Sequence, residues 1–360
     1  MGYGSDYGLG TSRAMGTREP YSVFWEANRM LKRILLALGA LLILLLAVAV
    51  LGPFLISRET MQPQGEARDA ATPESRFLTI PFAGTAGLPI HYLERGPGDG
   101  REGPTFVLLH GFTLNSFTWG PVLDAFAARG RTIAYDQPPY GLSAKPVPGD
   151  WTGANPYDKA AAIDQLFAVM DGLGVARAIL VGSSSGGTLA LEAALARPER
   201  VQALVLIAPW VYAQRPTLPT WLADLPQMRR LSLLIGRKLG ANTLLGLSFA
   251  EPQAITPERQ ELARLHARMA GWDLAWGELL NHSLTTPVDV GERLASVKQP
   301  VLLVTGERDR LVPPEDTKRV ASALPRAELA TLSNCGHVPH EECSNPFLEI
   351  VAPWLDRLEP

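Results

Sequence analysis

An uncharged run of 23 residues, from Ile34 to Ile56, is the feature that most restricts how this chain can fold. As a helix the run would be about 34 Å long, which is enough to cross the ~30 Å hydrocarbon layer of a bilayer. A helix on the surface of a soluble domain needs a polar stripe, and nearly every face of this segment is apolar. The run therefore predicts a transmembrane helix over residues 34–56.

A cleaved signal peptide is the main alternative, because Ala47-Val48-Ala49 is an acceptable cleavage site. Against it, 33 residues precede the run, and the apolar residues continue past this site to Ile56. A core helix of a soluble protein is the other alternative, but a soluble helix usually keeps a polar stripe, which this run does not have. We therefore favour an uncleaved anchor.

Basic residues near the ends of the run indicate its orientation. Three of them, Arg29, Lys32 and Arg33, lie within five residues of the N-terminal end, with Arg18 further upstream. The other side has Arg58 close by, and Arg68 and Arg76 further along. The balance predicts a single-pass membrane protein with its N-terminus inside and the bulk of the chain on the extracytoplasmic side.

The rest of the chain divides into three parts. Residues 1–33 are predicted to be a short disordered head, 57–75 a polar flexible linker, and 76–360 one globular domain. The whole chain has 46% hydrophobic and 19% charged residues, which is enough apolar sequence to bury a large core. The formal net charge of -3 argues against binding to nucleic acid, which needs a basic surface. The expected partners are a bilayer and a small-molecule or lipid substrate.

Short aliphatic runs alternate with helical stretches from residue 76 onward, which predicts an α/β fold with a mostly parallel central sheet flanked by helices. The alternation stops between about 211 and 290, where helical segments with Pro breaks predict an inserted lid. In this lid Trp221, Trp272 and Trp276 would line an acyl pocket; the alternative for them is plain core packing. Predicted strands cover residues 78–81, 90–94, 105–109, 132–136, 178–181, 203–207, 301–304 and 328–332.

One strand leads into Gly182-Ser183-Ser184-Ser185-Gly186-Gly187 and then into a predicted helix. This is a G-x-S-x-G pattern in the strand-turn-helix context that projects a serine hydroxyl from a tight turn. The hydroxyl would belong to Ser184, and the N–H of Ser185 would point to where an oxyanion develops. The alternative, a turn that is merely rich in Ser and Gly, does not account for this context.

Here the chain resembles the α/β-hydrolase superfamily, from residue 76 to its end. His110-Gly111-Phe112, after the strand at 105–109, resembles the family's H-G-x turn, which implies that the Phe112 N–H completes the oxyanion hole. His110 is then a structural turn residue. The segment from Asp136 to Ser143 is similar to the family's D-x-P-G-x-G-x-S loop, with Pro139 where Gly is usual.

The resemblance also implies the acid and the base of a catalytic triad. Asp309 follows the strand at 301–304, and His337 comes 28 residues later, so Ser184, Asp309 and His337 stand in the hydrolase order. Glu307 is the alternative acid and His340 the alternative base. Glu341 and Glu342, beside His340, are expected to be surface charges.

These residues predict a serine hydrolase that cleaves carboxylic esters, with the anchor and the apolar lid favouring lipophilic substrates. A serine nucleophile disfavours epoxide hydrolysis and dehalogenation, which use Asp in this superfamily. Carbon-carbon bond hydrolysis and perhydrolysis by the same triad remain open. Carbon-carbon hydrolases usually have a Gly-Pro-Gly-like loop where Thr113-Leu114-Asn115 stands here. A non-enzymatic receptor or scaffold on the same fold is a further alternative. We expect no cofactor and no metal.

Cys335 and Cys343, the only cysteines, lie on either side of His337. Packed cysteines commonly behave as small apolar residues, so we expect two unpaired thiols. The alternative is a disulfide across the loop of the base, which an oxidising exterior would permit.

Overall fold

The protein is described by a computed structural model that covers residues 1–2, 4, 20–57, 65–96, 103–212, 217–238 and 241–358. It contains two compact units, Met1–Leu55 and Ile56–Pro360.

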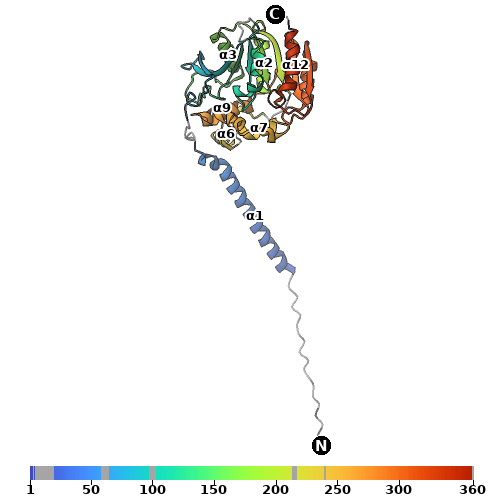
Figure 1. The fold of residues 1–360 in the computed structure, drawn as a ribbon. Coiled ribbons are helices and arrows are strands. Elements are labelled where there is room, and N and C mark those ends of the chain that lie inside the picture. Colours follow the sequence, from blue (N-terminus) through green and yellow to red (C-terminus); the bar gives the residue numbers. More distant parts are fainter. Residues whose placement is uncertain are drawn as a thin grey trace. The chain divides into compact units, whose positions relative to one another are not determined.

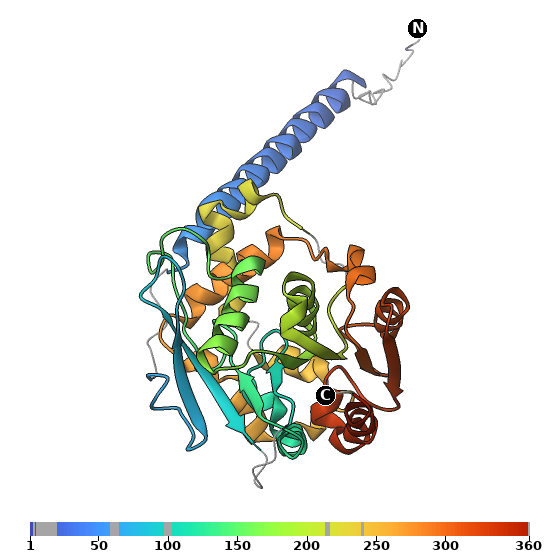
Figure 2. The same cartoon turned by 90° about the horizontal axis from the view of Figure 1, so that it is seen from above.

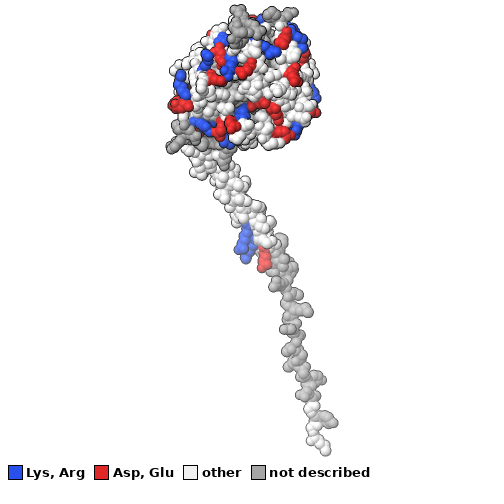
Figure 3. Space-filling model, in the orientation of Figure 1, with Lys and Arg blue, Asp and Glu red and all other residues white. Residues whose placement is uncertain are grey.

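The first unit contains one long helix, α1 (Pro20–Leu51), which continues into a 3-10 turn, η1 (Gly52–Leu55). The span Trp25–Leu55 has a mean hydropathy of 3.2 and is long and apolar enough to cross a membrane. Its charged side chains lie near its N-terminal end, at Glu26, Arg29, Lys32 and Arg33 (Figure 3).

The predicted disordered head is wrong for residues 20–33, which belong to α1. Extending a helix costs little once it has nucleated, and no Gly or Pro stands between Tyr21 and Arg33 to stop it. The rest of the predicted head, residue 3 and residues 5–19, lies outside the described residues.

The second unit is built on an eight-stranded sheet with the order β1-β2-β4-β3-β5-β6-β7-β8. Strands β3 to β8 are parallel, and β2 pairs antiparallel with both β1 and β4. All eight predicted strands are present: β1 (Ser75–Ile80), β2 (Leu88–Arg95), β3 (Phe106–Leu109), β4 (Thr132–Tyr135), β5 (Ala178–Ser183), β6 (Val201–Ile207), β7 (Val301–Gly306) and β8 (Ala327–Leu332).

Helices cover both faces of this sheet (Figure 2). Val107 and Leu109 of β3 join the core cluster that also holds residues of α3 (Lys159–Gly172), α4 (Ser185–Ala196) and α10 (Pro314–Ala323). Phe106 and Leu108 join the opposite cluster, with α2 (Gly120–Ala127) and α12 (Ser344–Asp356). Because both faces are buried, the central strands have continuous apolar sequences, and the predicted α/β-hydrolase architecture is confirmed.

The predicted lid consists of helices between β6 and β7, of which α6, α7 and α9 lie together on one side of the body (Figure 1). The bounds are α5 (Thr220–Ala223), α6 (Pro226–Lys238), α7 (Ala241–Ser248), η4 (Pro252–Ala254), α8 (Pro257–Ala263), η5 (Leu265–Arg268) and α9 (Trp272–Thr285). The remaining short helices are η2 (Ser116–Trp119), η3 (Pro198–Arg200), η6 (Val290–Glu292), η7 (Leu294–Ser296) and α11 (Pro339–Glu342).

Part of the predicted linker is not an extended tether. Gly65 forms a β-bridge with Met269 of the lid, and Ala67, Ala70 and Ala71 pack beside Leu142 and Leu265. Residues 65–74 therefore belong to the body, because their small apolar side chains find a complementary surface that composition does not reveal. Residues 58–64 lie outside the described residues.

The charged side chains of the body are mixed in sign on the face shown in Figure 3. Lys and Arg alternate with Asp and Glu there, which leaves no continuous basic surface on that face.

Candidate active site

The three residues predicted to form the triad follow parallel strands of the sheet. Ser184 comes directly after β5, Asp309 three residues after β7, and His337 five residues after β8. The carboxyl ends of parallel strands lie at one edge of a sheet, where open α/β sheets bind their ligands.

Ser184 has a backbone conformation that non-glycine residues rarely adopt, with φ 54° and ψ -117°. Backbone crowding around it admits only glycine at two neighbouring positions. A Cβ atom on Gly182 would lie 2.5 Å from the Gly186 carbonyl oxygen, and one on Gly186 would overlap the Leu109 carbonyl oxygen. The strained turn leaves Ser184 at the start of α4, as the sequence pattern predicts.

Asp309 and His337 are in direct contact. His337 Nδ1 lies 2.7 Å from Asp309 Oδ2, and both residues are buried. The other carboxylate oxygen accepts hydrogen bonds from the backbone N–H groups of Leu311 at 2.8 Å and Val312 at 2.9 Å. A carboxylate at Nδ1 holds the proton there and leaves Nε2 available as an acceptor.

No hydrogen bond joins Ser184 Oγ to His337 in this structure. Catalytic hydrogen bonds of this kind are often long until substrate binds. The structure thus brings the predicted acid and base into contact, and Ser184 lies at the same edge of the sheet without a hydrogen bond to His337.

The two predicted oxyanion donors lie beside Ser184. A Cβ atom on Gly111 would be 3.2 Å from the Ser184 Cβ, so the turn that carries Phe112 passes next to the serine. Ser185 is the first residue of α4, where backbone N–H groups have no partner within the helix. In the described part of the chain, neither the Phe112 N–H nor the Ser185 N–H donates to a protein acceptor.

The alternative acid and base are placed elsewhere. Glu307 is exposed, whereas Asp309 is buried. His340 stacks on Trp119 with 4.5 Å between ring centroids, and its Nε2 lies 3.2 Å from the Thr118 hydroxyl. Burial lowers the pKa of His340 to about 4. No carboxylate orients this ring as Asp309 orients His337, because its Nδ1 has no partner in the described chain.

The prediction that Glu341 and Glu342 are surface charges is wrong. The Glu341 carboxylate is buried, where it pairs with Arg259 and accepts from the Thr118 hydroxyl. Glu342 is partly buried and accepts three backbone hydrogen bonds. Partners distant in the sequence hold these carboxylates inside, and the local sequence does not reveal them.

His110 has the structural position that the sequence predicts. Its Nδ1 lies 2.8 Å from the Gly111 carbonyl oxygen, and its Nε2 accepts from the Gln137 N–H at 2.9 Å. Both ring nitrogens have partners, and burial lowers the pKa of the ring, so His110 holds the turn that carries Phe112 as a neutral group.

Asp136 connects this turn to the neighbouring loop. Its carboxylate accepts from the N–H groups of Ser116 at 2.6 Å and Leu142 at 2.7 Å, and it contacts His91 Nδ1 at 2.7 Å. A Cβ atom on Gly141 would overlap that carboxylate. Burial by itself would raise the pKa of Asp136, but the charge of His91 and these hydrogen bonds hold it below its ordinary value.

A cavity of about 220 Å³ adjoins the predicted oxyanion donors, since Phe112 and Ser185 both line it. It lies between α4, α3 and the lid helix α9, and its surface is mostly apolar. The sequence predictions did not include the α9 residues that face it. Their spacing of three and four residues, which places them on one face of the helix, is the sequence signal that indicates them. The α9 lining consists of Leu279, His282 and Ser283.

The predicted tryptophan pocket needs correction. Trp221 is 70% exposed and does not line this cavity. Trp272 and Trp276 are buried in an aromatic cluster, in which the Trp276 ring lies 4.9 Å from the Phe112 ring. They support the wall of the cavity from behind, because the lining residues Phe112 and Leu279 pack against their cluster. Burial of large aromatic side chains of this kind contributes strongly to core stability.

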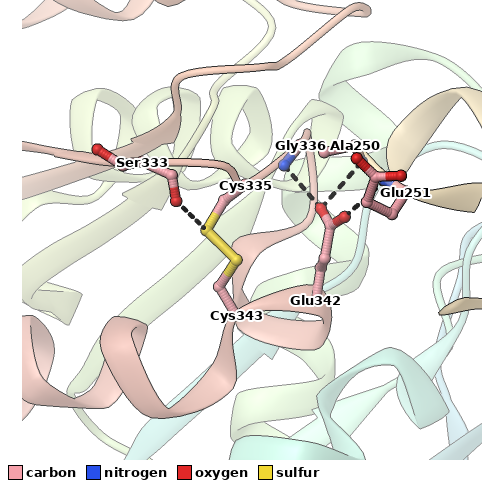
Figure 4. Close-up of a disulfide and its surroundings, with 7 residues drawn as sticks. All are labelled: Ala250, Glu251, Ser333, Cys335, Gly336, Glu342 and Cys343. Atoms are coloured by element: carbon pink, nitrogen blue, oxygen red, sulfur yellow. Dashed lines mark hydrogen bonds between the residues drawn. A yellow bond between two sulfur atoms is a disulfide. The ribbon is translucent and has the colours of Figure 1, made fainter.

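The expectation of unpaired cysteines is also wrong. Cys335 and Cys343 form a disulfide, with their Cα atoms 6.2 Å apart (Figure 4). The intervening turn of α11 brings the two residues within reach, and spacing alone could not establish this. Among the described residues, no group of His, Cys, Asp or Glu could hold a metal ion.

A family model described as the alpha/beta hydrolase fold matches residues 104–343. A 2-hydroxy-6-oxononadienedioate/2-hydroxy-6-oxononatrienedioate hydrolase of Paraburkholderia phymatum is 33% identical over 300 residues, which cover 80% of this chain and 96% of that protein. A pimeloyl-(acyl-carrier protein) methyl ester esterase of Shewanella sp. (strain MR-7) is 29% identical over 262 residues, 71% of this chain and 91% of that protein.

Among solved structures, a membrane phospholipase A has the same fold, with a TM-score of 0.62 at 23% identity over 91% of this chain and 99% of that one. The chain belongs to the α/β-hydrolase family, and it is an enzyme.

Asp136→Asn is expected to reduce the free energy of unfolding by about 3 to 5 kcal/mol, the usual cost of leaving a buried charge without its partner. Asp124→Asn, at an exposed carboxylate that pairs with Arg95 among the described residues, is the matched control and should cost less than about 1 kcal/mol. Urea unfolding measures both. Because the pKa of Asp136 is depressed in the folded state, its contribution should be complete above about pH 4 and decline below it. Equal costs for the two variants would contradict the role of Asp136.

The disulfide is expected in protein isolated from its native source, and mass spectrometry without reduction should find no free thiol there. Replacing both Cys335 and Cys343 by Ser should reduce the free energy of unfolding by about 2 to 3 kcal/mol, because the bond closes a short loop. Free thiols in the native material would contradict the bond.

Proposed function

We propose that this enzyme is a membrane-anchored serine hydrolase that cleaves carboxylic esters with an apolar acyl group. The observation that carries this proposal is the buried 2.7 Å contact between His337 Nδ1 and Asp309, at the sheet edge where the strained turn presents Ser184.

In the proposed reaction, Ser184 Oγ attacks the carbonyl carbon of the ester while His337 Nε2 takes the hydroxyl proton. Asp309 stabilises the imidazolium. The N–H groups of Phe112 and Ser185 bind the oxyanion, a contribution of about 3 to 4 kcal/mol per donor in comparable sites. Expulsion of the alcohol, which receives the proton from His337, leaves an acyl-enzyme. Water then attacks the acyl-enzyme by the same route and releases the acid.

The charges of the cavity support an uncharged acyl group. Lys159 and Glu192 both line it. Lys159 Nζ lies 2.7 Å from Asp289 and 3.3 Å from Glu192, and Glu192 also pairs with Arg293 at 2.8 Å. Since these groups neutralise one another, the lysine is not available to bind a substrate carboxylate.

Carbon-carbon bond hydrolysis is the second candidate. The relative at 33% identity is named for a 2-hydroxy-6-oxo dienedioate, and the names of the relatives favour this activity more than ester cleavage. A dienedioate carries two carboxylates, and the cavity has no unpaired positive charge among its described residues to bind them, which favours the ester. The Thr113-Leu114-Asn115 loop also favours the ester, because it stands where carbon-carbon hydrolases usually have a Gly-Pro-Gly-like loop. The related methyl ester esterase supports the ester as well. No observation favours perhydrolysis, and membership of an enzyme family argues against a receptor.

The proposed location is a membrane with the catalytic body on the extracytoplasmic side. Helix α1 could anchor it there, and the basic residues at the start of that helix favour an inside N-terminus. The disulfide beside His337 adds support, because such bonds persist in oxidising compartments.

For the triad, Ser184→Ala should abolish labelling by a fluorophosphonate probe and nearly all turnover. Asp309→Asn should lower kcat by about 10⁴, since the histidine loses control of its tautomer. Glu307→Gln is the matched control, at an exposed carboxylate two residues away, and should retain near-normal kcat. Greater damage from Glu307→Gln than from Asp309→Asn would refute the acid assignment.

For the substrate, hydrolysis of 4-nitrophenyl esters from acetate to palmitate by the full-length protein in detergent should peak above butyrate. Leu279→Trp, which fills the cavity, should move the optimum to shorter chains. The same preparation should act poorly on a 2-hydroxy-6-oxo dienedioate. A maximum at acetate would overturn the apolar acyl site, and a higher kcat/KM on the dienedioate than on every ester would favour the second candidate.

A further inference from the structure

The segment from Ser248 to Glu251, which joins α7 to η4 in the lid, is bound by the loop of the proposed base. The His337 N–H donates to the Ser248 carbonyl oxygen at 2.7 Å. One residue earlier, Gly336 packs so closely on this segment that a Cβ atom on it would lie 2.5 Å from both the Ala250 nitrogen and the Ser248 oxygen. The backbone before the base is therefore in van der Waals contact with the lid.

The loop of the proposed acid contacts the same segment. Arg308 and Arg310 stand on either side of Asp309. Arg308 Nη1 lies 2.7 Å from the Glu251 carboxylate, and the Arg310 guanidinium donates to the Phe249 carbonyl oxygen. The loops of the proposed acid and the proposed base thus both contact the lid segment Ser248–Glu251.

Glu342 connects these parts through a single carboxylate (Figure 4). Its Oε2 accepts from the N–H groups of Gly336 at 2.7 Å and Ala250 at 3.1 Å, and its Oε1 accepts from the Glu251 N–H at 3.0 Å. One donor comes from the base loop and two come from the lid. Hydrogen bonds to an ionised carboxylate are stronger than those between neutral groups, so this joint is stronger than backbone contact alone.

The disulfide fixes where this carboxylate can be. Glu342 is followed by Cys343, and Cys343 is bonded to Cys335, the residue before Gly336. The disulfide therefore holds Glu342 close to Gly336, the residue that its carboxylate binds, and His337 lies within the loop that the bond closes.

We propose that Glu342 is a positioning residue, which joins the His337 loop to the lid segment Ser248–Glu251 and so makes the alignment of the base depend on the lid. The inference rests on the proposed role of His337. Without the carboxylate, three backbone N–H groups lose their acceptor, and only the direct backbone contacts with Ser248 and Ala250 still join Gly336 and His337 to the lid. A displacement of the base by about 1 Å can cost about 10²-fold in rate.

The test compares Glu342→Gln and Glu342→Ala in the full-length protein with the control Glu328→Gln. Glu328 is an exposed carboxylate on the same unit, and among the described residues it pairs with Arg357. Glutamine keeps the shape of the side chain but has an NH₂ group in place of one carboxylate oxygen. Because NH₂ is a donor, it cannot accept the backbone N–H hydrogen bonds that this oxygen accepted, and the joint is weakened.

For both Glu342 variants we expect kcat on a 4-nitrophenyl ester to fall by about 10- to 100-fold with KM within about threefold of the wild type. Fluorophosphonate labelling of Ser184 should slow by a similar factor. Hydrogen exchange should accelerate at the amides of Gly336, Ala250 and Glu251 and stay unchanged in the sheet. Glu328→Gln should match the wild type in every readout.

Wild-type kcat in a folded Glu342→Gln or Glu342→Ala protein would overturn the proposal. So would a loss of kcat accompanied by faster exchange throughout the sheet, since the effect would then be one of global stability. If Glu342→Ala does not fold, Glu342→Gln decides. Failure of the proposed function is distinguishable, because it would appear as activity and labelling that survive Ser184→Ala.

Discussion

The backbone packing around Ser184 is the constraint on which the rest of the site depends. The turn can bring β5 into α4 only because Gly182 and Gly186 carry no side chain where carbonyl oxygens of the turn and of β3 approach. The same closeness places the Phe112 turn next to the serine and leaves the first N–H of α4 without a partner in the described chain. One steric requirement thus fixes the positions of the proposed nucleophile and both proposed oxyanion donors relative to each other.

Much of the fold and the proposed triad could be predicted from sequence, since local patterns carry those features. Strands buried on both faces appear as aliphatic runs, and β5, β6 and β7 lie where such runs were found. The turn at Ser184 is specified by its own glycines. The contact between Asp309 and His337 spans 28 residues, yet each follows a strand, so the sheet brings them to one edge.

What the sequence could not supply depends on partners from distant elements. Glu341 and Glu342 resemble surface charges until Arg259 and the lid backbone are placed against them. Helix α1 begins earlier than the sequence predicts, because polar residues continue a helix that an apolar run has nucleated. Residue type alone predicts that the tryptophans of the lid line an acyl pocket, but Trp221 is exposed and Trp276 packs behind Phe112. In each case burial is decided by tertiary contacts.

The most direct test of the central claim is a crystal structure of the full-length protein after reaction with a long-chain alkyl phosphonate. We predict a covalent bond from Ser184 Oγ to phosphorus, with the phosphonyl oxygen within hydrogen-bonding distance of the Phe112 and Ser185 N–H groups. The alkyl chain should lie in the cavity between α4 and α9. An adduct whose oxygen points away from both N–H groups, or whose chain lies outside this cavity, would contradict the account.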